Sequence, residues 1–153
     1  MTLTQQTLSP ALAAWLHDNG YSPDDLNQPG ENGDSALMKL TRASHLDWMQ
    51  ELLAVGVNIN WRNLDGNNAL WFACFGNFYD AIDLLVAAGI DIDNQNDNGA
   101  TALMYAASAG KIEVLQQLLT LGANAALRNL DNFTALDFAS TQAIWRVLKH
   151  AAK

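Results

Sequence analysis

Cysteine is almost absent from this chain, since its 153 residues contain only Cys74. A single thiol cannot form a disulfide within the chain, so no disulfide framework supports the fold. The N-terminus also lacks the basic flank and apolar core of a secretory signal. These two absences together favour the reducing cytosol, and we expect a cytoplasmic protein.

Basic residues are scarce as well, with 8 Lys and Arg against 16 Asp and Glu, which gives a formal net charge of -8. A surface of this sign repels phosphate groups, so neither nucleic acid nor a membrane surface is an expected partner. Long apolar runs are missing too, because Gly, Asp or Asn interrupts each run well short of the roughly 20 residues that cross a bilayer. Half of the residues are nevertheless apolar, which is enough to bury a core in one domain.

Residue clusters that support catalysis or metal binding are also missing. No histidine has a Cys or second His at metal-ligand spacing, and the three histidines are His17, His45 and His150. There is no Gly-rich phosphate loop and no nucleophile elbow. Residues 94–99 place oxygen-bearing side chains at alternate positions, as a calcium loop does, but the twelfth position is Tyr105 instead of a bidentate Glu. We therefore predict no catalytic residue, no metal and no cofactor.

What the sequence does contain is an internal repeat with a period of 33 residues. The recurring positions include Gly33, Gly66 and Gly99, then Ala36, Ala69 and Ala102, then Leu52, Leu85 and Leu118, and finally Asn63, Asn96 and Asn129. This spacing predicts three full units over 31–63, 64–96 and 97–129. Residues 8–30 are interpreted as a degenerate N-terminal cap and 130–153 as a shortened C-terminal unit. The whole chain, 1–153, is then one domain.

The third unit shows the expected structure of each repeat. Thr101 is a natural N-cap for a first helix over 102–109, and a second helix is expected over 112–121. The residue that ends the first helix must accept a left-handed backbone, and the three units have Ser44, Asn77 and Gly110 there. Residues 123–131 are rich in Asn and Asp, which predicts a finger-like hairpin projecting into solvent. Because neither helix can bury its apolar stripe alone, the units must stack.

This pattern resembles the ankyrin repeat over about residues 31–150, through the period and the strings Gly99-Ala-Thr-Ala-Leu-Met-Tyr-Ala-Ala and Leu118-Leu-Thr-Leu-Gly-Ala-Asn. The resemblance implies an all-α ankyrin-repeat solenoid of stacked helix-turn-helix units with projecting hairpin loops. In place of the family's usual Pro the units have Ala36, Ala69, Ala102 and Ala135, and in place of its usual His they have Met38, Trp71, Met104 and Asp137. Alanine is compatible with a helix, so we expect the fold to be retained. The family's usual hydrogen bonding between units, in contrast, is not expected to be conserved in this chain.

The resemblance further implies a protein-protein interaction module whose partner binds the concave side, over the finger tips and the exposed face of each first helix. The partner-binding residues predicted in this way are Arg42, Leu64, Asp65, Asn67, Phe72, Phe75, Asp97, Asn98, Tyr105, Ser108, Leu130 and Phe133. Aromatic side chains on a surface often anchor interfaces, so Phe72, Phe75 and Tyr105 are the main candidates. The carboxylates along the edge favour a protein partner with basic groups around an apolar centre, and the free chain is expected to be a monomer.

Several individual residues allow two interpretations. Cys74 corresponds to Ala107, which favours a packed and unreactive thiol over a nucleophile. Trp71 follows a core leucine and is expected in the core, whereas Trp61 could belong to the core or to the surface. Asn60 resembles an ankyrin position that some cellular hydroxylases modify, but a role in stabilising the hairpin is the favoured interpretation.

For the chain as a whole, a binding module is favoured over an enzyme that uses the groove as a substrate cleft, because the sequence shows no convergent set of titratable groups. Self-association through the groove or through an incompletely capped end belongs to the same binding class. The last helix is expected to carry a basic outer face made of Arg146, Lys149 and Lys153.

Overall fold

The computed structural model describes residues 8–151, and its regular elements are all helical. In chain order these are α1 (Pro10–Asp18), the 3-10 helix η1 (Glu31–Gly33), α2 (Ala36–Arg42), α3 (Leu46–Ala54), α4 (Ala69–Phe75), α5 (Tyr79–Ala87), α6 (Ala102–Ser108), α7 (Ile112–Thr120), the 3-10 helix η2 (Leu136–Phe138) and α8 (Gln142–Ala151). Within residues 8–151 the only β-type pairing is an isolated bridge between Ser22 and Asp25. The predicted all-α class is therefore confirmed.

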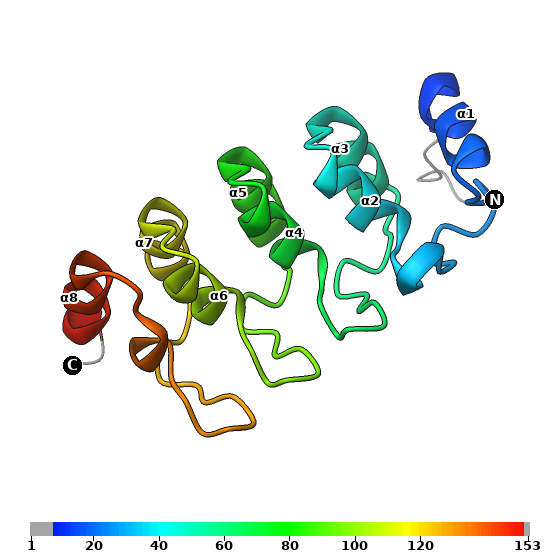
Figure 1. Cartoon of the computed structure of the whole chain (residues 1–153). Helices are drawn as coiled ribbons and strands as arrows, with labels where there is room; N and C mark the ends of the chain where they lie inside the picture. Colours follow the sequence, from blue (N-terminus) through cyan, green and yellow to red (C-terminus); the bar gives the residue numbers. More distant parts are fainter. Residues whose placement is uncertain (1–7, 152–153) are drawn as a thin grey trace.

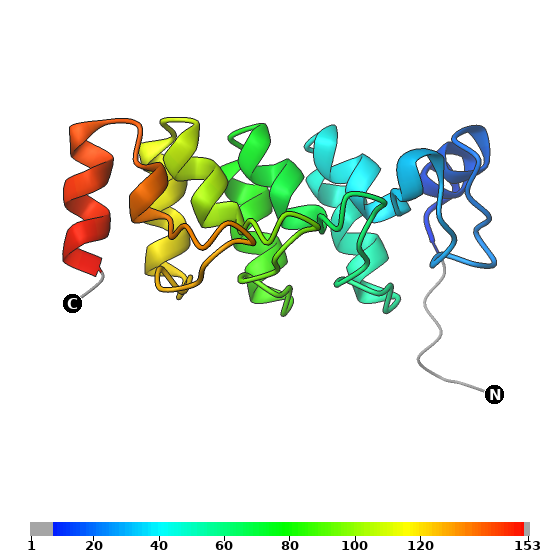
Figure 2. The ribbon, with the colours of Figure 1, turned by 60° about the horizontal axis from the view of Figure 1, so that its bottom comes forward.

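Three helix pairs stand side by side in a row, α2 with α3, α4 with α5 and α6 with α7, as Figure 1 shows. Helix α1 lies at one end of the row, and η2 with α8 lies at the other. The loops between successive pairs extend to one side as fingers, and the second view shows the same single row (Figure 2). The molecule is thus an elongated stack in which each pair contacts mainly its two neighbours.

Polar caps at a spacing of 33 residues start the three first helices. The side-chain oxygens of Ser35, Asn68 and Thr101 accept hydrogen bonds from backbone N–H groups in the first turns of α2, α4 and α6, at 3.2, 3.1 and 3.1 Å. Each cap satisfies a backbone donor that has no partner within the helix. The predicted N-cap role of Thr101 is confirmed.

A left-handed residue follows each first helix and turns the chain into the second. Ser44, Asn77 and Gly110 have φ values of 54°, 57° and 72°. This conformation costs energy for most side chains and little for Gly or Asn, which explains why two of the three units use those residues. The predicted positions are confirmed, although α6 and α7 each end one residue earlier than expected, at Ser108 and Thr120.

The core runs along the stack between the two helices of each pair. Leu52, Leu85 and Leu118, which lie one period apart, are completely buried. Burying a leucine side chain fully contributes about 1.5–3 kcal/mol, and the same contribution recurs in every unit. Leu12 and Leu16 of α1 and Ile144 and Leu148 of α8 extend this core into the two ends.

The last unit keeps its second helix but has only one turn of its first. Helix η2 takes the place of a seven-residue first helix, and Asp137 accepts hydrogen bonds from the backbone and hydroxyl of Thr134 at 2.8 and 3.1 Å. Arg146 and Lys149 are exposed on α8, as the sequence predicts, whereas Lys153 lies outside the described residues.

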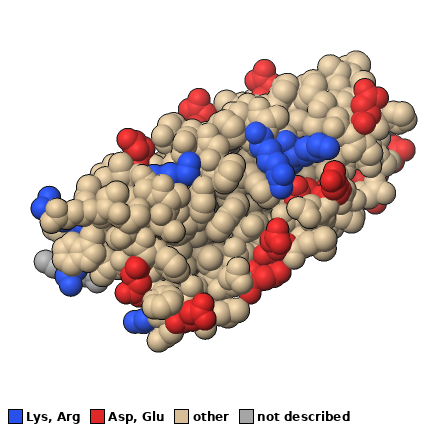
Figure 3. Space-filling view, viewed as in Figure 1, with Lys and Arg blue, Asp and Glu red and all other residues tan. Residues whose placement is uncertain are grey.

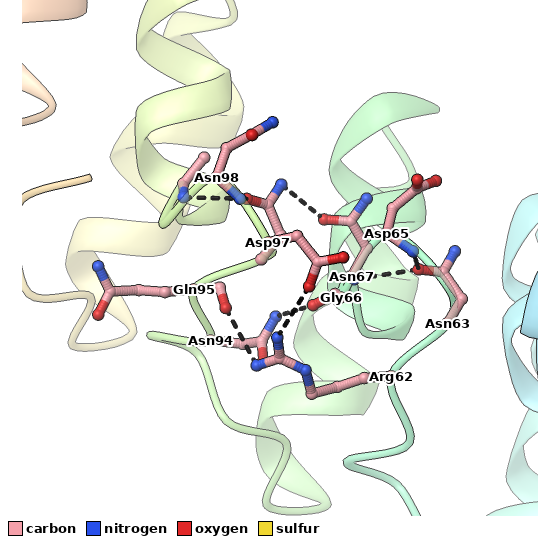
Figure 4. Close-up of polar contacts among 11 residues, drawn as sticks. Arg62, Asn63, Asp65, Gly66, Asn67, Asn94, Gln95, Asp97 and Asn98 are labelled. Carbon is pink, nitrogen blue, oxygen red and sulfur yellow. Dashed lines mark hydrogen bonds and ion pairs between the residues drawn. The ribbon is translucent and has the colours of Figure 1, made fainter. Parts of the chain in front are cut away.

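Asparagine side chains hold the fingers to one another (Figure 4). The Oδ1 atom of Asn96 accepts hydrogen bonds from two N–H groups of its own finger, those of Asn98 and Ala100, both at 3.0 Å. Its Nδ2 atom donates to Oδ1 of Asn67 in the preceding finger, also at 3.0 Å. Asn63 does the same, donating to Oδ1 of Asp34 at 2.9 Å. One amide therefore closes a finger and joins it to its neighbour.

A second set of contacts joins the bases of the fingers. The Oδ1 atom of Asn60 accepts a hydrogen bond from the N–H of Asp91 at 2.8 Å, and Asn27 and Asp93 make the equivalent contacts to Asn58 and Asn124. Trp61 is half-buried, and its indole N–H donates to the carbonyl of Gly33 at 2.7 Å. Both side chains therefore join successive units, which agrees with the favoured interpretation of Asn60 and gives Trp61 a structural role.

Replacing Asn96 by Asp tests the contact between fingers. The change keeps the oxygen that closes the finger but removes the Nδ2 donor to Asn67, so we expect the free energy of unfolding to fall by ~1–3 kcal/mol. Equilibrium urea denaturation at neutral pH measures the difference.

Asn129→Asp is the matched control for this substitution. Asn129 also accepts from two N–H groups of its finger, but the residue that corresponds to Asn67 there is Ala100, which has no side-chain acceptor. We expect this variant to lie within about 0.5 kcal/mol of the wild type. Equal losses in the two variants would contradict the proposed role of the cross-finger amide.

Candidate protein-binding surface

A hollow in the predicted partner-binding surface lies between α2, α4 and the finger that precedes α4. Its volume is about 460 Å³, and its lining residues are Arg42, Asp65, Asn67, Trp71, Phe72, Phe75, Gly76 and Phe78. Four of these side chains are aromatic rings, whereas the only ionised groups in the lining are those of Arg42 and Asp65. The hollow is therefore mainly apolar with a few polar groups at its edge, as is usual for a recognition site.

Arg42 forms a fixed wall of this hollow. Its Nη2 atom lies 2.8 Å from Oδ2 of Asp34, a carboxylate that is almost fully buried and also accepts the amide of Asn63. The guanidinium carbon of Arg42 lies 4.0 Å from the centre of the Phe72 ring, within the range of a cation–π interaction. A guanidinium held from two sides retains little freedom, so the wall is already formed before any partner binds.

An aromatic cluster continues from the hollow towards the third unit. The ring of Tyr105 lies 4.8 Å from that of Trp71 and 6.2 Å from that of Phe75, measured between centroids. Burial, and to a lesser extent the neighbouring Cys74, raises the pKa of the Tyr105 hydroxyl above its usual range. Phe75 remains 64 % exposed although it is a large apolar ring. The structure therefore brings together the three rings of Phe72, Phe75 and Tyr105 that the sequence favoured.

Trp71 does not occupy the core position that the sequence predicts. Its counterparts in the neighbouring units, Met38 and Met104, are buried. The indole is larger than a methionine side chain, and it is half-buried at the hollow beside Tyr105. A comparison of the units could have indicated that Trp71 lies outside the core, because the equivalent positions of the neighbouring units have methionine and a core position accepts little change in side-chain volume.

Gly76 and Phe78 were also missing from the predicted set. A Cβ atom at Gly76 would collide with the ring of Phe78, so the glycine lets this ring pack beside the hollow. The corresponding positions in the other units are Ala43 and Ala109, and neither is followed two residues later by Phe. The combination of a small residue and a phenylalanine is therefore specific to the second unit.

The tips of the fingers carry most of the remaining predicted residues. The side chains of Leu64, Asp65, Asp97, Asn98, Ser108, Leu130 and Phe133 are exposed. Backbone hydrogen bonds of 3.0 Å set the spacing between the fingers. The N–H groups of Leu64, Asp97 and Leu130 each donate to a carbonyl of the preceding finger. The ring of Phe133 packs edge-on against Phe138, with 5.9 Å between centroids.

Asn67 differs from this group. It is only 8 % exposed, and its side-chain oxygen accepts the amide of Asn96 at 3.0 Å. The expectation that its side chain lies free on the surface is therefore wrong, because the contact between the fingers already uses its acceptor. The position lines the hollow, but its polar group acts within the stack.

Charge is unevenly distributed over this side of the molecule. In the view of Figure 3, Asp and Glu atoms lie along both long edges of the molecule, the finger side included, and a group of Lys and Arg atoms lies between the edges. Arg62 binds the neighbouring finger, with its Nη1 atom 3.0 Å from Oδ1 of Asn94 and its Nη2 atom 3.7 Å from Oδ1 of Asp97 (Figure 4). The carboxylate of Asp65 remains exposed at the edge of the hollow.

Residues 8–151 show neither a metal-binding cluster nor a membrane-spanning helix. That part of the chain holds no group of three or more His, Cys, Asp or Glu side chains arranged to bind a metal ion. None of its helices combines the length and the apolar character that crossing a membrane requires.

The chain belongs to the ankyrin-repeat family. A family model described as "Ankyrin repeats (3 copies)" matches residues 4–96 and 75–152, which together cover nearly the whole sequence. A search of the curated proteins finds no match to the chain. Ankyrin repeats are generally protein-protein interaction modules, and the family is typically non-enzymatic.

The burial of Cys74 predicts an unreactive thiol. The side chain is completely buried, and this burial raises the pKa of the thiol to about 12. Because the thiolate is the reactive form, we expect native protein at neutral pH to react with an aromatic disulfide reagent only as fast as it unfolds. The measurement is the absorbance of the released thiolate.

Protein dissolved in concentrated urea provides the control, since all of its thiol should react at once. Rapid stoichiometric labelling of the native protein would contradict the packed interpretation and would make Cys74 a candidate nucleophile.

Proposed function

We propose that this chain is a non-enzymatic adaptor, regulator or inhibitor that binds a protein partner over its first helices and finger tips. The predicted partner-binding residues other than Asn67 form this surface, with Phe72, Phe75 and Tyr105 at its centre. In this proposal residues 1–153 act as one domain, and the single buried thiol is consistent with a cytoplasmic protein. The observation that carries the proposal is the exposure of Phe75 beside a preformed aromatic hollow.

The energetic argument rests on the exposed aromatic surface. Apolar surface that leaves water on binding contributes about 25 cal/mol per Å², and a rigid aromatic ring loses little conformational entropy when it is covered. The walls of the hollow are fixed in the free chain by the contacts of Arg42 with Asp34 and Phe72. A partner therefore gains apolar contact without first having to order the site.

The partner is proposed to present basic groups around an apolar centre. Asp65, Asp97 and Asp131 are exposed on successive fingers, so they form an acidic edge beside the aromatic rings. Lysine or arginine side chains of a partner would meet these carboxylates while its apolar groups fill the hollow. Charges at such a rim mainly increase the association rate and the specificity.

An enzymatic function is the less favoured alternative. General acid–base chemistry needs a titratable group within about 3.2 Å of the reacting proton and with a suitably shifted pKa. The lining of the hollow has one exposed carboxylate, that of Asp65, and one guanidinium that is already paired with Asp34. The nearby thiol of Cys74 is buried, and its pKa of about 12 disfavours nucleophilic attack.

Affinity capture tests the proposed surface. The wild-type chain of residues 1–153 and a Phe72→Ala, Phe75→Ala, Tyr105→Ala variant are used in parallel to capture proteins from a lysate of the cells that produce the chain. We expect a partner that the wild type retains and the variant loses, because truncating an aromatic hot spot of an interface costs ~2 kcal/mol or more. Circular dichroism first establishes that the variant keeps its helix content.

Tyr79→Ala is the matched control, because Tyr79 is another exposed aromatic residue but lies on α5, outside the lining of the hollow. This variant should retain the partner. Equal capture by the wild type, the triple variant and the control would place the interface elsewhere on the chain.

A further inference from the structure

The two sides of each second helix face different neighbours. On α7, the amide of Gln117 donates to the carbonyl of Tyr79 and to Oδ1 of Asp83, at 2.9 and 2.8 Å, so this side faces the preceding α5. Leu115 lies two positions earlier, which is about 200° around a helix. Leu115 therefore points the opposite way, towards the next unit along the stack.

The position of Leu115 recurs in every second helix. Met49 on α3, Ile82 on α5 and Leu115 on α7 lie one period apart, and all three are completely buried. Each belongs to a unit that another unit follows. The position is therefore an inter-unit contact site, and burying an apolar side chain there contributes to stacking.

Trp145 occupies this position on α8. The last unit is three residues shorter than the others, so Trp145 corresponds to Leu115 with a spacing of 30 residues instead of 33. Hydrogen bonds at the start of the two helices support this alignment. The N–H of Trp145 donates to the carbonyl of Thr141, and the N–H of Leu115 donates to the carbonyl of Lys111. The neighbouring side chains Ile144 and Leu148 are buried in the same pattern as Val114 and Leu118. Trp145 itself is 46 % exposed, because no described unit follows α8.

Cationic side chains surround this exposed ring. Arg146 and Lys149 are exposed on α8, and the Nζ atom of Lys149 lies 5.5 Å from the centre of the Trp145 ring. The sequence contains no Asp or Glu after Asp137. This end of the stack thus presents an aromatic contact site within a basic surface.

The opposite end has the complementary charge. The sequence contains no Lys or Arg before Lys39, whereas Asp18, Asp24, Asp25 and Glu31 are all exposed. Helix α1 and the loop that follows it form the end of the row farthest from α8 (Figure 1). The two ends of the molecule therefore differ in charge and can attract each other between copies.

We propose that a second copy of the chain covers Trp145, with α8 of one copy packing on the acidic α1 end of the next. Such head-to-tail contact continues the stack from one molecule to another. Two α8 faces cannot pair as favourably, because their cations would repel. Since one helix face offers a small contact area, the association is weak, and the dilute chain remains the monomer expected from its sequence.

Sedimentation velocity over a concentration series tests this proposal. The monomer mass is 16.6 kDa. We expect the average mass of the wild type to rise above this value between about 10 µM and about 1 mM, as for a weak transient interface. Raising the ionic strength should reduce the association, because salt screens the opposing charges.

Two variants distinguish the ends. Trp145→Glu blocks the α8 end, and a double variant with Asp18→Lys and Asp24→Lys blocks the α1 end. Each alone should remain monomeric across the series, whereas an equimolar mixture should form dimers and nothing larger, because each copy keeps one working end. Arg146→Glu with Lys149→Glu replaces the tryptophan variant if that variant loses helix content.

Phe75→Ala is the control, because it alters the aromatic hollow and neither end, and it should associate like the wild type. Loss of association in this control would instead place the self-contact in the hollow. A wild type that stays monomeric over the whole range, or an α1-end variant that associates normally, would overturn the proposal. Neither result bears on the proposed partner surface, which is tested separately.

Discussion

The fold depends on the coverage of each unit's apolar face by its neighbour. A single pair of short helices exposes too much apolar surface to be stable, and helices of seven to nine residues are marginal in water without tertiary contacts. Leu115, Ile82 and Met49 illustrate this dependence, because all three are completely buried and each belongs to a unit that another unit follows. Stability is therefore a property of the row, and the end units determine which apolar groups stay exposed.

The fingers follow the same logic with polar groups. Asn63 and Asn96 each use one amide to close a finger and to bind the preceding finger, so the finger positions are linked along the stack. Buried polar groups are costly unless they are paired, and these side chains are paired on both sides. The spacing of the exposed tips is thus a consequence of buried hydrogen bonds, and it keeps the acidic edge at a fixed distance from the aromatic rings.

The hollow is a local departure from the repeat. In the second unit a tryptophan replaces methionine, and a glycine admits the ring of Phe78, so that Trp71 and Phe78 both line the hollow. Arg42 comes from the unit before, and its position depends on the buried carboxylate of Asp34. A few substitutions that change side-chain volume or remove a Cβ atom therefore create the hollow at which we propose that a partner binds.

Sequence by itself determined the family, the helical repeat and the helix ends, because these depend on short-range periodicity and on residues such as Thr101 and Asn77 whose local preferences are strong. The repeat also indicated that Phe72, Phe75 and Tyr105 lie outside the core, and in the structure Phe75 is exposed while Phe72 and Tyr105 are half-buried. Only the tertiary structure decided that Asn67 is buried, that Trp71 lies at the surface of the hollow and that Trp145 is uncovered. The physical reason is that the burial of these side chains depends on contacts between units. Such contacts depend on the volumes of the side chains in both units and on whether a further unit follows. The repeat pattern of a single unit does not specify them.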